Sequence, residues 1–286
     1  MIVVTGATGR FGRQVIKHLL DRGVPAGRIA AAVRAPAKAA GLAALGIEIR
    51  LSDYGRPETL LAAFAGADKV LLVSSTGPDK TRIEQHRAAI DAVRASGVGL
   101  MAYTSVTSAP SNPMGLARVH RATEQAIVDS GLPAVLLRNG WYTENHTAAL
   151  PGAIGRGTLA GSAGAGRIAS ATRADLAEAA AVVLTLDDQA GKIYDLTGDT
   201  AWSMPELAAE GAAQSGTPLT YTDLPAGQYR QILHQAGLPD HTADLIVDAD
   251  VQISHGALAH VTNDLSRLLG RSTTQLSAAV AQALES

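Results

Sequence analysis

The sequence predicts an α/β protein built on a Rossmann-type, doubly wound parallel sheet, with a smaller, mainly helical C-terminal lobe. Apolar runs alternate with helical stretches through the first half of the chain, and the first run leads directly into three glycines. After residue 138 the texture changes to a glycine-rich segment followed by helical patterns. We expect residues 1–150 to form the Rossmann domain, with returns to it near residues 165–200, and residues 200–286 to form the smaller lobe.

The alternation can be followed element by element. Strands are expected at the apolar runs Ile2–Val4, Ile29–Val33, Ile47–Leu51, Val70–Val73, Leu100–Tyr103 and Ala134–Leu137. Helices are expected between them, near Phe11–Arg22, Ala37–Leu45, Pro57–Phe64, Lys80–Ser96 and Ala117–Ser130. Glycine follows four of these helices, where a left-handed residue commonly ends a helix, at Gly46, Gly66, Gly97 and Gly131. This order of strands and helices is typical of a parallel sheet.

The second half is expected to be different. Pro151–Gly166 is rich in glycine and predicts a loop with short strands. An alanine-rich helix is expected from Thr172 to Leu184 and a strand at Lys192–Thr197. Ser203-Met-Pro-Glu206 is a capping box that starts a helix. Further helices are expected at Gly227–Ala236, Thr242–Ser254, Asn263–Leu269 and Thr274–Leu284.

Composition limits the functions that the chain can have. Of its 286 residues 47% are hydrophobic and the formal net charge is −2, which supports a sizeable core and predicts no nucleic-acid partner. There is no cysteine, which excludes disulfides, thiolate zinc sites and cysteine catalysis. Because no apolar run approaches the ~20 residues that cross a bilayer and no basic n-region is evident, we expect no membrane association, no secretory signal and a cytoplasmic location.

The opening of the chain combines a strand, a tight turn and the start of a helix. Gly6, Gly9 and Gly12 follow the first strand with the spacing Gly-x-x-Gly-x-x-Gly. Gly6 allows a sharp turn, Gly9 lets the backbone approach an anion, and Gly12 lets the helix lie close to the strand. The helix N-terminus then offers backbone N–H groups and a partial positive charge to a pyrophosphate. The residues predicted to bind a dinucleotide here are Gly6, Ala7, Thr8, Gly9, Arg10, Phe11 and Gly12.

Basic residues follow the second predicted strand. An NAD-binding site normally places Asp or Glu there to bind the ribose 2′-hydroxyl, but this chain has Arg34 and Lys38. A 2′-phosphate would find a bidentate donor in Arg34, so the sequence favours NADP(H) over NAD(H). The alternative is that both are solvated surface charges.

Polar residues also follow the third and fourth strands. Asp53 could accept from the adenine amino group or cap the helix that begins near Pro57. Ser74, Ser75 and Thr76 could flank the cofactor ribose or make an ordinary turn.

Several motifs together resemble the NmrA-like family of atypical short-chain dehydrogenases. They are Val-Thr-Gly-Ala-Thr-Gly-Arg-Phe-Gly, Ala-Val-Arg34-Ala-Pro-Ala-Lys38, Ala-Tyr103-Thr-Ser105, Leu-Arg138-Asn139-Gly140-Trp141-Tyr142-Thr-Glu-Asn145, Ala169-Ser-Ala-Thr-Arg173-Ala-Asp175 and Gly198-Asp-Thr-Ala-Trp202. The likeness covers nearly the whole chain and is greatest to the bacterial NAD(P)H:quinone oxidoreductases of the second type, with the triphenylmethane reductases next. The glycine motif is common to many dehydrogenases, whereas the two later arginine-containing runs are more specific.

The resemblance implies an NADP-binding domain, a small substrate-binding lobe and reduction of a quinone-like acceptor by NADPH. It extends the cofactor-binding set to Arg138, Asn139, Gly140, Trp141, Tyr142, Thr143 and Arg173. Relatives that bind NADP(H) without catalysis, as redox-sensing regulators, provide one alternative, and reductases of triarylmethane dyes or other xenobiotics provide another. No flavin site is evident, so hydride is expected to pass directly from nicotinamide to acceptor. The oligomeric state is left open, a homodimer included.

The usual tyrosine–lysine pair of short-chain dehydrogenases is absent, because none of Tyr54, Tyr103 and Tyr142 has a lysine four residues later. A quinone needs less help than a ketone, since its reduced oxygen is a stabilised phenolate, and positioning in dry surroundings can suffice.

Four residues are therefore candidates for the chemistry. Trp141 and Tyr142 could stack on a nicotinamide or an aromatic acceptor, or could be a packed connection. His120 could be a proton donor or a solvated helix histidine, and Asn145, like Asn139, could hold a carboxamide or tie a turn. The histidines of the C-terminal region match no metal-binding spacing, so no metal is expected.

Overall fold

The computed structural model describes residues 1–285 and divides the chain into two compact units. The sheet unit comprises Met1–Ala109, Arg118–Asn139 and Arg173–Asp195. The helical unit comprises Pro110–Ala117, Gly140–Thr172 and the chain from Leu196 onward. The chain thus leaves the sheet unit briefly at Pro110–Ala117, leaves it again at Gly140, after β6 and before residue 150, returns at Arg173 and leaves it finally after Asp195.

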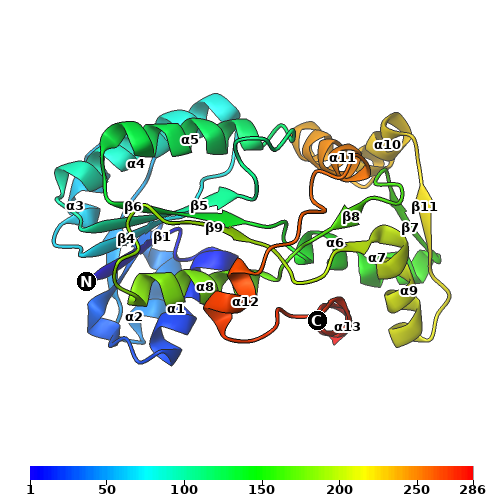
Figure 1. The fold of residues 1–286 in the computed structure, drawn as a ribbon, viewed down its shortest axis with the longest axis horizontal. Helices are drawn as coiled ribbons and strands as arrows, with labels where there is room; N and C mark the ends of the chain where they lie inside the picture. The colour runs from blue at the N-terminus through cyan, green and yellow to red at the C-terminus, as the bar shows by residue number, and fades with distance from the viewer. Residues whose placement is uncertain (286) are drawn as a thin grey trace. The chain divides into compact units, whose positions relative to one another are not determined.

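The sheet unit confirms the predicted Rossmann-type architecture (Figure 1). Its strands are β1 (Ile2–Thr5), β2 (Ile29–Val33), β3 (Glu48–Leu51), β4 (Lys69–Leu72), β5 (Leu100–Val106), β6 (Ala134–Asn139) and β9 (Ile193–Leu196). They lie in the order β3-β2-β1-β4-β5-β6-β9, and the pairs from β3 through β6 are parallel. Val4 pairs with Ala31 on one side and with Leu71 on the other, so the order reverses at β1. A crevice at such a reversal is the usual ligand site of an open α/β sheet.

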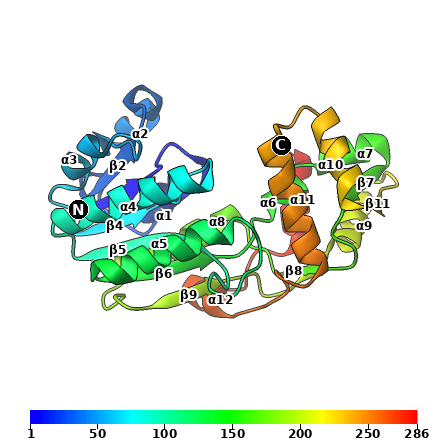
Figure 2. The same ribbon diagram turned by 90° about the horizontal axis from the view of Figure 1, so that it is seen from above.

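Helices cover both faces of this sheet. They are α1 (Arg10–Asp21), α2 (Ala40–Ala43), α3 (Leu60–Phe64), α4 (Asp79–Ala95), α5 (Ala117–Ser130) and α8 (Arg173–Thr185), with short 3-10 turns at Ala26–Arg28, Pro36–Ala39 and Pro57–Thr59. Figure 1 shows α3, α4 and α5 on one face and α1 and α8 on the other, and Figure 2 shows α4 beside α5. The second predicted helix, Ala37–Leu45, is shorter than expected, because a 3-10 turn takes its first part. The four predicted helix-ending glycines all adopt positive φ, as expected.

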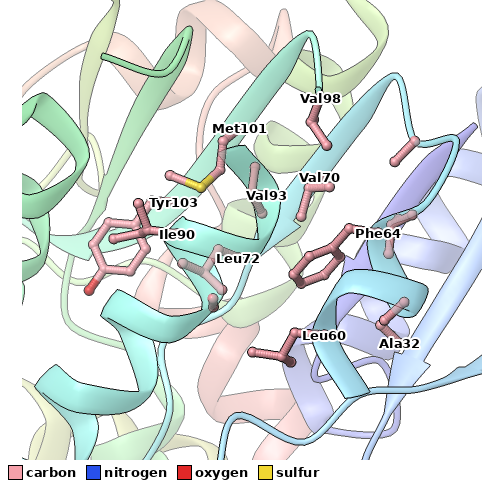
Figure 3. Packing of buried hydrophobic residues seen from close by; sticks show 14 of the residues in the cluster. Ala32, Leu60, Phe64, Val70, Leu72, Ile90, Val93, Val98, Met101 and Tyr103 are labelled. Atoms are coloured by element: carbon pink, nitrogen blue, oxygen red, sulfur yellow. The ribbon is translucent and has the colours of Figure 1, made fainter. Parts of the chain in front are cut away.

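The core between the sheet and α3–α4 explains why the strands read as continuous apolar runs. Phe64 and Leu60 from α3 pack with Leu72 and Met101 of the sheet, and Tyr103 lies on the same side beside Ile90 of α4 (Figure 3). Every residue of β5 is buried. A parallel strand covered on both faces has no solvent side, so its sequence shows no polar alternation.

The helical unit confirms a mainly helical C-terminal lobe. Its helices are α6 (Glu144–Thr147), α7 (Leu150–Arg156), α9 (Met204–Ser215), α10 (Ala226–Gln235), α11 (Asp240–Ser254), α12 (Asp264–Leu269) and α13 (Leu276–Glu285). Its strands are β7 (Thr158–Gly161) with β11 (Thr220–Asp223), and β8 (Arg167–Ile168) with β10 (Trp202–Ser203). The Ser203–Glu206 capping box is present as predicted. None of the helices formed by residues 1–285 is both long and apolar enough to cross a membrane.

The prediction of a loop from Pro151 onward was wrong for its first part. Residues Leu150–Arg156 form α7, with Pro151 in its first turn and Gly157 at positive φ after its end. Leu150 and Ala153 are fully buried in the apolar cluster of this unit. Burial of that helical face outweighs the low helix propensity of Gly152 and Gly155, as tertiary packing often does.

Asp250 of α11 provides a pH-dependent test of the helical unit. It is buried, accepts the backbone N–H of Ser162 at 2.8 Å, and has its pKa raised to about 6 by burial and by nearby Asp223. Because the folded pKa lies above the unfolded value of about 3.9, ionised Asp250 lowers the free energy of unfolding, fully above about pH 6 and not below about pH 4. We expect Asp250→Asn to stabilise the protein at pH 8 by about 1–3 kcal/mol more than at pH 4.

Thermal unfolding of both proteins at the two pH values measures this difference. Asp248→Asn, which removes another carboxylate of α11 that accepts a backbone N–H, is the control. An equal effect of Asp250→Asn at the two pH values would contradict the prediction.

Candidate functional site

A cavity of about 750 Å³ opens at the carboxyl ends of β1 to β4, within the sheet unit. This is the size of a typical small-molecule or cofactor site. It is lined by the first glycines, by the ends of β2 and β3 and by the turn after β4: Gly6, Thr8, Gly9, Arg13, Ala32, Val33, Arg34, Ala35, Lys38, Ser52, Asp53, Tyr54, Val73, Ser74, Ser75, Thr76 and Gln85. The cavity therefore lies where the strand order reverses, as the Rossmann architecture predicts.

The glycine turn has the geometry that the sequence predicted. Gly6 adopts φ +58°, a conformation that glycine favours. A Cβ on Gly12 would lie 2.5 Å from the Gly6 carbonyl oxygen, so only glycine lets α1 come this close to β1. Gly9 lies directly before α1 and lines the cavity, and as a glycine it has no side chain that could cap the helix. The first turn of α1 thus faces the cavity as a site for an anion.

Of the remaining residues of this motif, Thr8 alone lies in the wall of the cavity. Thr8 lines it with Gly6 and Gly9, whereas Ala7, Phe11 and Gly12 are buried behind the turn and Arg10 is exposed at the start of α1.

Cationic side chains dominate the wall. Arg34 and Lys38 both line the cavity, are exposed, and have no ion-pair partner within residues 1–285. Arg13, which the sequence reasoning missed, joins them and donates through Nε to the carbonyl oxygen of Thr8 at 3.0 Å. Asp53 is the lone carboxylate among the described lining residues. The balance of charge favours a ligand with several negative groups.

Asp53 makes an Asx turn rather than capping the next helix. Its Oδ1 accepts the N–H of Gly55 at 2.9 Å, and the 3-10 turn at Pro57–Thr59 and the following α3 start without a side-chain cap. Asp53 lines the cavity, and its contact with an adenine stays a prediction.

The turn after β4 is tightly bound from behind. Val73 N–H donates to Thr5 Oγ1 at 2.8 Å, and Ser74 N–H donates to Thr104 Oγ1 at 2.9 Å. Tyr54 OH also bonds to Thr5 Oγ1 and to the carbonyl oxygen of Val73. Residues 74–76 therefore form a fixed wall of the cavity.

Arg138 braces the ends of the central strands. Its guanidinium donates to both oxygens of Glu124, at 3.0 and 2.7 Å, and lies 3.7 Å from Asp195. Ser105 Oγ donates to the same Glu124 carboxylate at 2.5 Å. The Glu124 carboxylate raises the pKa of Arg138, so this side chain is a fixed cation within the sheet unit. Arg138 does not line the cavity.

Asn139 is the last residue of β6, and its side-chain amide makes no hydrogen bond with the described residues. Both polar atoms of its side chain are buried and have no hydrogen-bond partner among residues 1–285. Leaving a buried amide without partners costs free energy, and a bound carboxamide would supply both a donor and an acceptor.

Gly140 and Thr143 belong to the helical unit. Glycine is required at residue 140, because a Cβ added there would lie 2.8 Å from the Leu196 carbonyl oxygen. Thr143 is buried, with Oγ1 2.8 Å from Ser170 Oγ. Arg173 begins α8 of the sheet unit and does not line the cavity.

The four candidates for chemistry are divided between the units. Trp141 and Tyr142 are half-buried and Asn145 is exposed in the helical unit, and the Trp141 Nε1 has no partner among the described residues. His120 is buried in the sheet unit with Nδ1 2.9 Å from the hydroxyl of Tyr103. It is not a solvated histidine.

Burial also limits what His120 can do. Burial, with Arg82 and His86 nearby, lowers the pKa of His120 to about 3, and burial raises the pKa of Tyr103 to about 12. Both groups are neutral at pH 7, so the expected imidazolium donor does not fit this environment.

The chain matches the NAD(P)H-binding family over residues 6–187. It is 47% identical to quinone oxidoreductase 2 of Escherichia coli over 98% of this chain and 97% of that protein. The crystal structure of that NADPH-dependent enzyme with NADPH covers 99% of this chain and 100% of its own, with a TM-score of 0.96 and 46% identity. Citrobacter sp. triphenylmethane reductase complexed with NADP(H) matches with a TM-score of 0.96 and 38% identity, covering 99% of this chain and 100% of its own. On the strength of these matches and of its glycine turn, the chain belongs to the NAD(P)H-binding family.

Proposed function

We propose that this protein is an NADPH-dependent oxidoreductase that reduces quinones by direct hydride transfer, without a flavin. The observation that carries the proposal is the cavity of the sheet unit, where the glycine turn before α1 and three cations surround one continuous space. The 47% identity to quinone oxidoreductase 2 supports the quinone as acceptor.

The residues present fit NADPH. The Gly6–Gly12 turn and the start of α1 would hold the pyrophosphate, where any Cβ on Gly12 would collide with the backbone. Arg34, with Lys38 and Arg13 nearby, would bind the 2′-phosphate, and Asp53 would accept from the adenine amino group.

The chemistry then depends on position. Bound nicotinamide supplies the hydride, and the quinone accepts it to give a stabilised phenolate. A hydrogen bond from the buried amide of Asn139, which does not line the cavity, to the carboxamide of the cofactor stays a prediction. Stacking by Trp141 and Tyr142, hydrogen bonding by Asn145 and a contribution of neutral His120 stay predictions, as do contacts of Arg138, Gly140, Thr143 and Arg173 with the cofactor.

Oxidation of NADPH in the presence of benzoquinone or naphthoquinone tests the proposal. We expect a rate well above the uncatalysed background with quinone, and none with NADPH alone. A triphenylmethane dye, assayed in parallel, tests the second candidate function, which the 38% identity to triphenylmethane reductase favours. Tight NADP(H) binding without turnover of any acceptor would instead indicate a redox sensor. The cytoplasmic location and a homodimer remain predictions from the sequence.

Arg34→Ala tests cofactor selection. We expect the variant to bind NADPH about 10- to 100-fold more weakly, because a charge-assisted bond to phosphate is lost, while NADH binding changes by less than about twofold. Calorimetric titration with both coenzymes gives the ratio. Arg56→Ala, which removes an exposed arginine outside the cavity, is the matched control. An unchanged NADPH-to-NADH ratio in Arg34→Ala would remove Arg34 from the site.

A further inference from the structure

Three successive backbone N–H groups of the turn after β4 are bound by side chains from three different elements. Thr5 of β1 accepts from Val73, and Thr104 of β5 accepts from Ser74. The third acceptor is His86 of α4, whose Nε2 receives the N–H of Ser75 at 3.0 Å. The first two acceptors are hydroxyls of strand residues, whereas His86 reaches the turn from a helix.

His86 is held as a single tautomer. Thr123 Oγ1 donates its own hydrogen to the carbonyl oxygen of Val119 at 2.8 Å, so its oxygen can only accept from His86 Nδ1, which lies 2.8 Å away. Nδ1 therefore carries the hydrogen, and the lone pair of Nε2 faces the Ser75 N–H. The Ser75 hydroxyl, 3.2 Å from the same nitrogen, can only add a second donor.

The imidazole is enclosed. His86 is fully buried, with the rings of Tyr54 and Tyr103 at centroid distances of 6.4 and 5.8 Å. Burial, and then the nearby guanidinium of Arg82, lowers the pKa of His86 to about 3, so the ring stays neutral through the physiological range. A second proton on Nε2 would place two donors face to face. The ring thus acts as a rigid acceptor and not as an acid or base.

The turn that His86 holds lines the cavity on the side of β4, through Ser74, Ser75 and Thr76. His86 itself does not line the cavity and lies on the far side of this wall. His86 therefore acts on a bound cofactor through residues that line the cavity, and its one hydrogen bond to the backbone of this turn is to the Ser75 N–H.

We propose that His86 is a positioning residue for NADPH: fixed by Thr123 as its Nδ1–H tautomer, it anchors the Ser75 N–H and so holds the 74–76 wall against the cofactor. The inference rests on the cofactor part of the proposed function. It assigns to a buried histidine of α4 a part in cofactor affinity, and none in the transfer of hydride or proton.

Two conservative variants distinguish the role of Nε2 from that of Nδ1. His86→Gln places an amide oxygen near the position of Nε2 and can still accept from Ser75, whereas His86→Asn has a donor near Nδ1 but no acceptor within reach of Ser75. Both remove the ring and its packing, so a general loss of stability affects both alike. We expect the Kd and KM for NADPH to rise about tenfold or more in His86→Asn and to stay within about threefold of wild type in His86→Gln. The kcat at saturating NADPH and the KM for benzoquinone stay close to wild type in both.

If the variants do not fold, nitrogen NMR of the histidine rings in the wild-type protein tests the proposal, because it reads the tautomer of His86 and its response to NADPH. We expect His86 as the Nδ1–H tautomer, unchanged from pH 5 to pH 9, with its Nε2 resonance shifted by NADPH. The opposite tautomer, or equal NADPH affinity of the Gln and Asn variants, would overturn the proposal. Failure of the wild-type protein itself to bind NADPH would instead refute the proposed function.

Discussion

Gly12→Ala is expected to lower the free energy of unfolding by about 1–3 kcal/mol and to weaken NADPH binding by about tenfold or more. The new methyl group would lie 2.5 Å from the Gly6 carbonyl oxygen and 2.9 Å from the Ala7 Cα. Both are backbone atoms and cannot rotate away, so α1 must move off the turn. This displacement shifts the N–H groups that face the cavity, and small misplacements of binding groups are costly. Chemical unfolding and calorimetric titration with NADPH measure the two effects.

Gly41→Ala is the matched control. Gly41 also lies in a helix, α2, but nothing stands within 4 Å of its added Cβ. Alanine is the better helix former, so this variant should be neutral or slightly stabilising. If Gly12→Ala behaved like Gly41→Ala, the close packing of α1 on the glycine turn would not be what requires glycine at residue 12.

The sheet could be predicted because its signals are local. Each buried strand is a short apolar run. Four of the predicted helices are followed by a glycine, and each of these glycines has a positive φ. Helix α7 was missed for the opposite reason. Gly152 and Gly155 argue against a helix in isolation, and only the burial of Leu150 and Ala153 in the core of the helical unit, which no local pattern reveals, stabilises it.

The same distinction separates the site residues found from those missed. Gly6 and Arg34 directly follow strands and Ser74 lies two residues after β4, so chain order alone brings them to one edge of the sheet. Gln85 and His86 lie one to two turns inside α4, and their approach to the turn after β4 depends on how that helix packs. Arg13 did carry a local signal, a cation in the first turn of the helix after the glycines. Chain order therefore predicts the site residues that follow strands better than those that a helix brings to the cavity.

Arg138→Met is expected to destabilise the sheet unit by about 3–5 kcal/mol, because it leaves the Glu124 carboxylate buried with the loss of its cationic partner. The two side chains are only 13% and 9% exposed, and their bonds are bidentate. The Ser105 hydroxyl remains as a donor to Glu124 but carries no charge to balance it. Chemical unfolding of the variant measures the cost, and a loss below about 1 kcal/mol, the value of an exposed pair, would contradict the burial of the pair.

The double variant Arg138→Met with Glu124→Leu decides whether Arg138 only braces the sheet unit or also contacts the cofactor, as the resemblance implies. Replacing both members of a buried ion pair with apolar side chains is often close to neutral, so most of the lost stability should return. If Arg138 is a brace alone, NADPH affinity should return with it, because the Gly6–Gly12 turn and Arg34 are untouched. If stability returns while NADPH still binds weakly, Arg138 contacts the cofactor as well. The guanidinium is already shared by Glu124 and Asp195, so joint recovery of affinity and stability would replace the predicted cofactor contact of Arg138 with a bracing role alone.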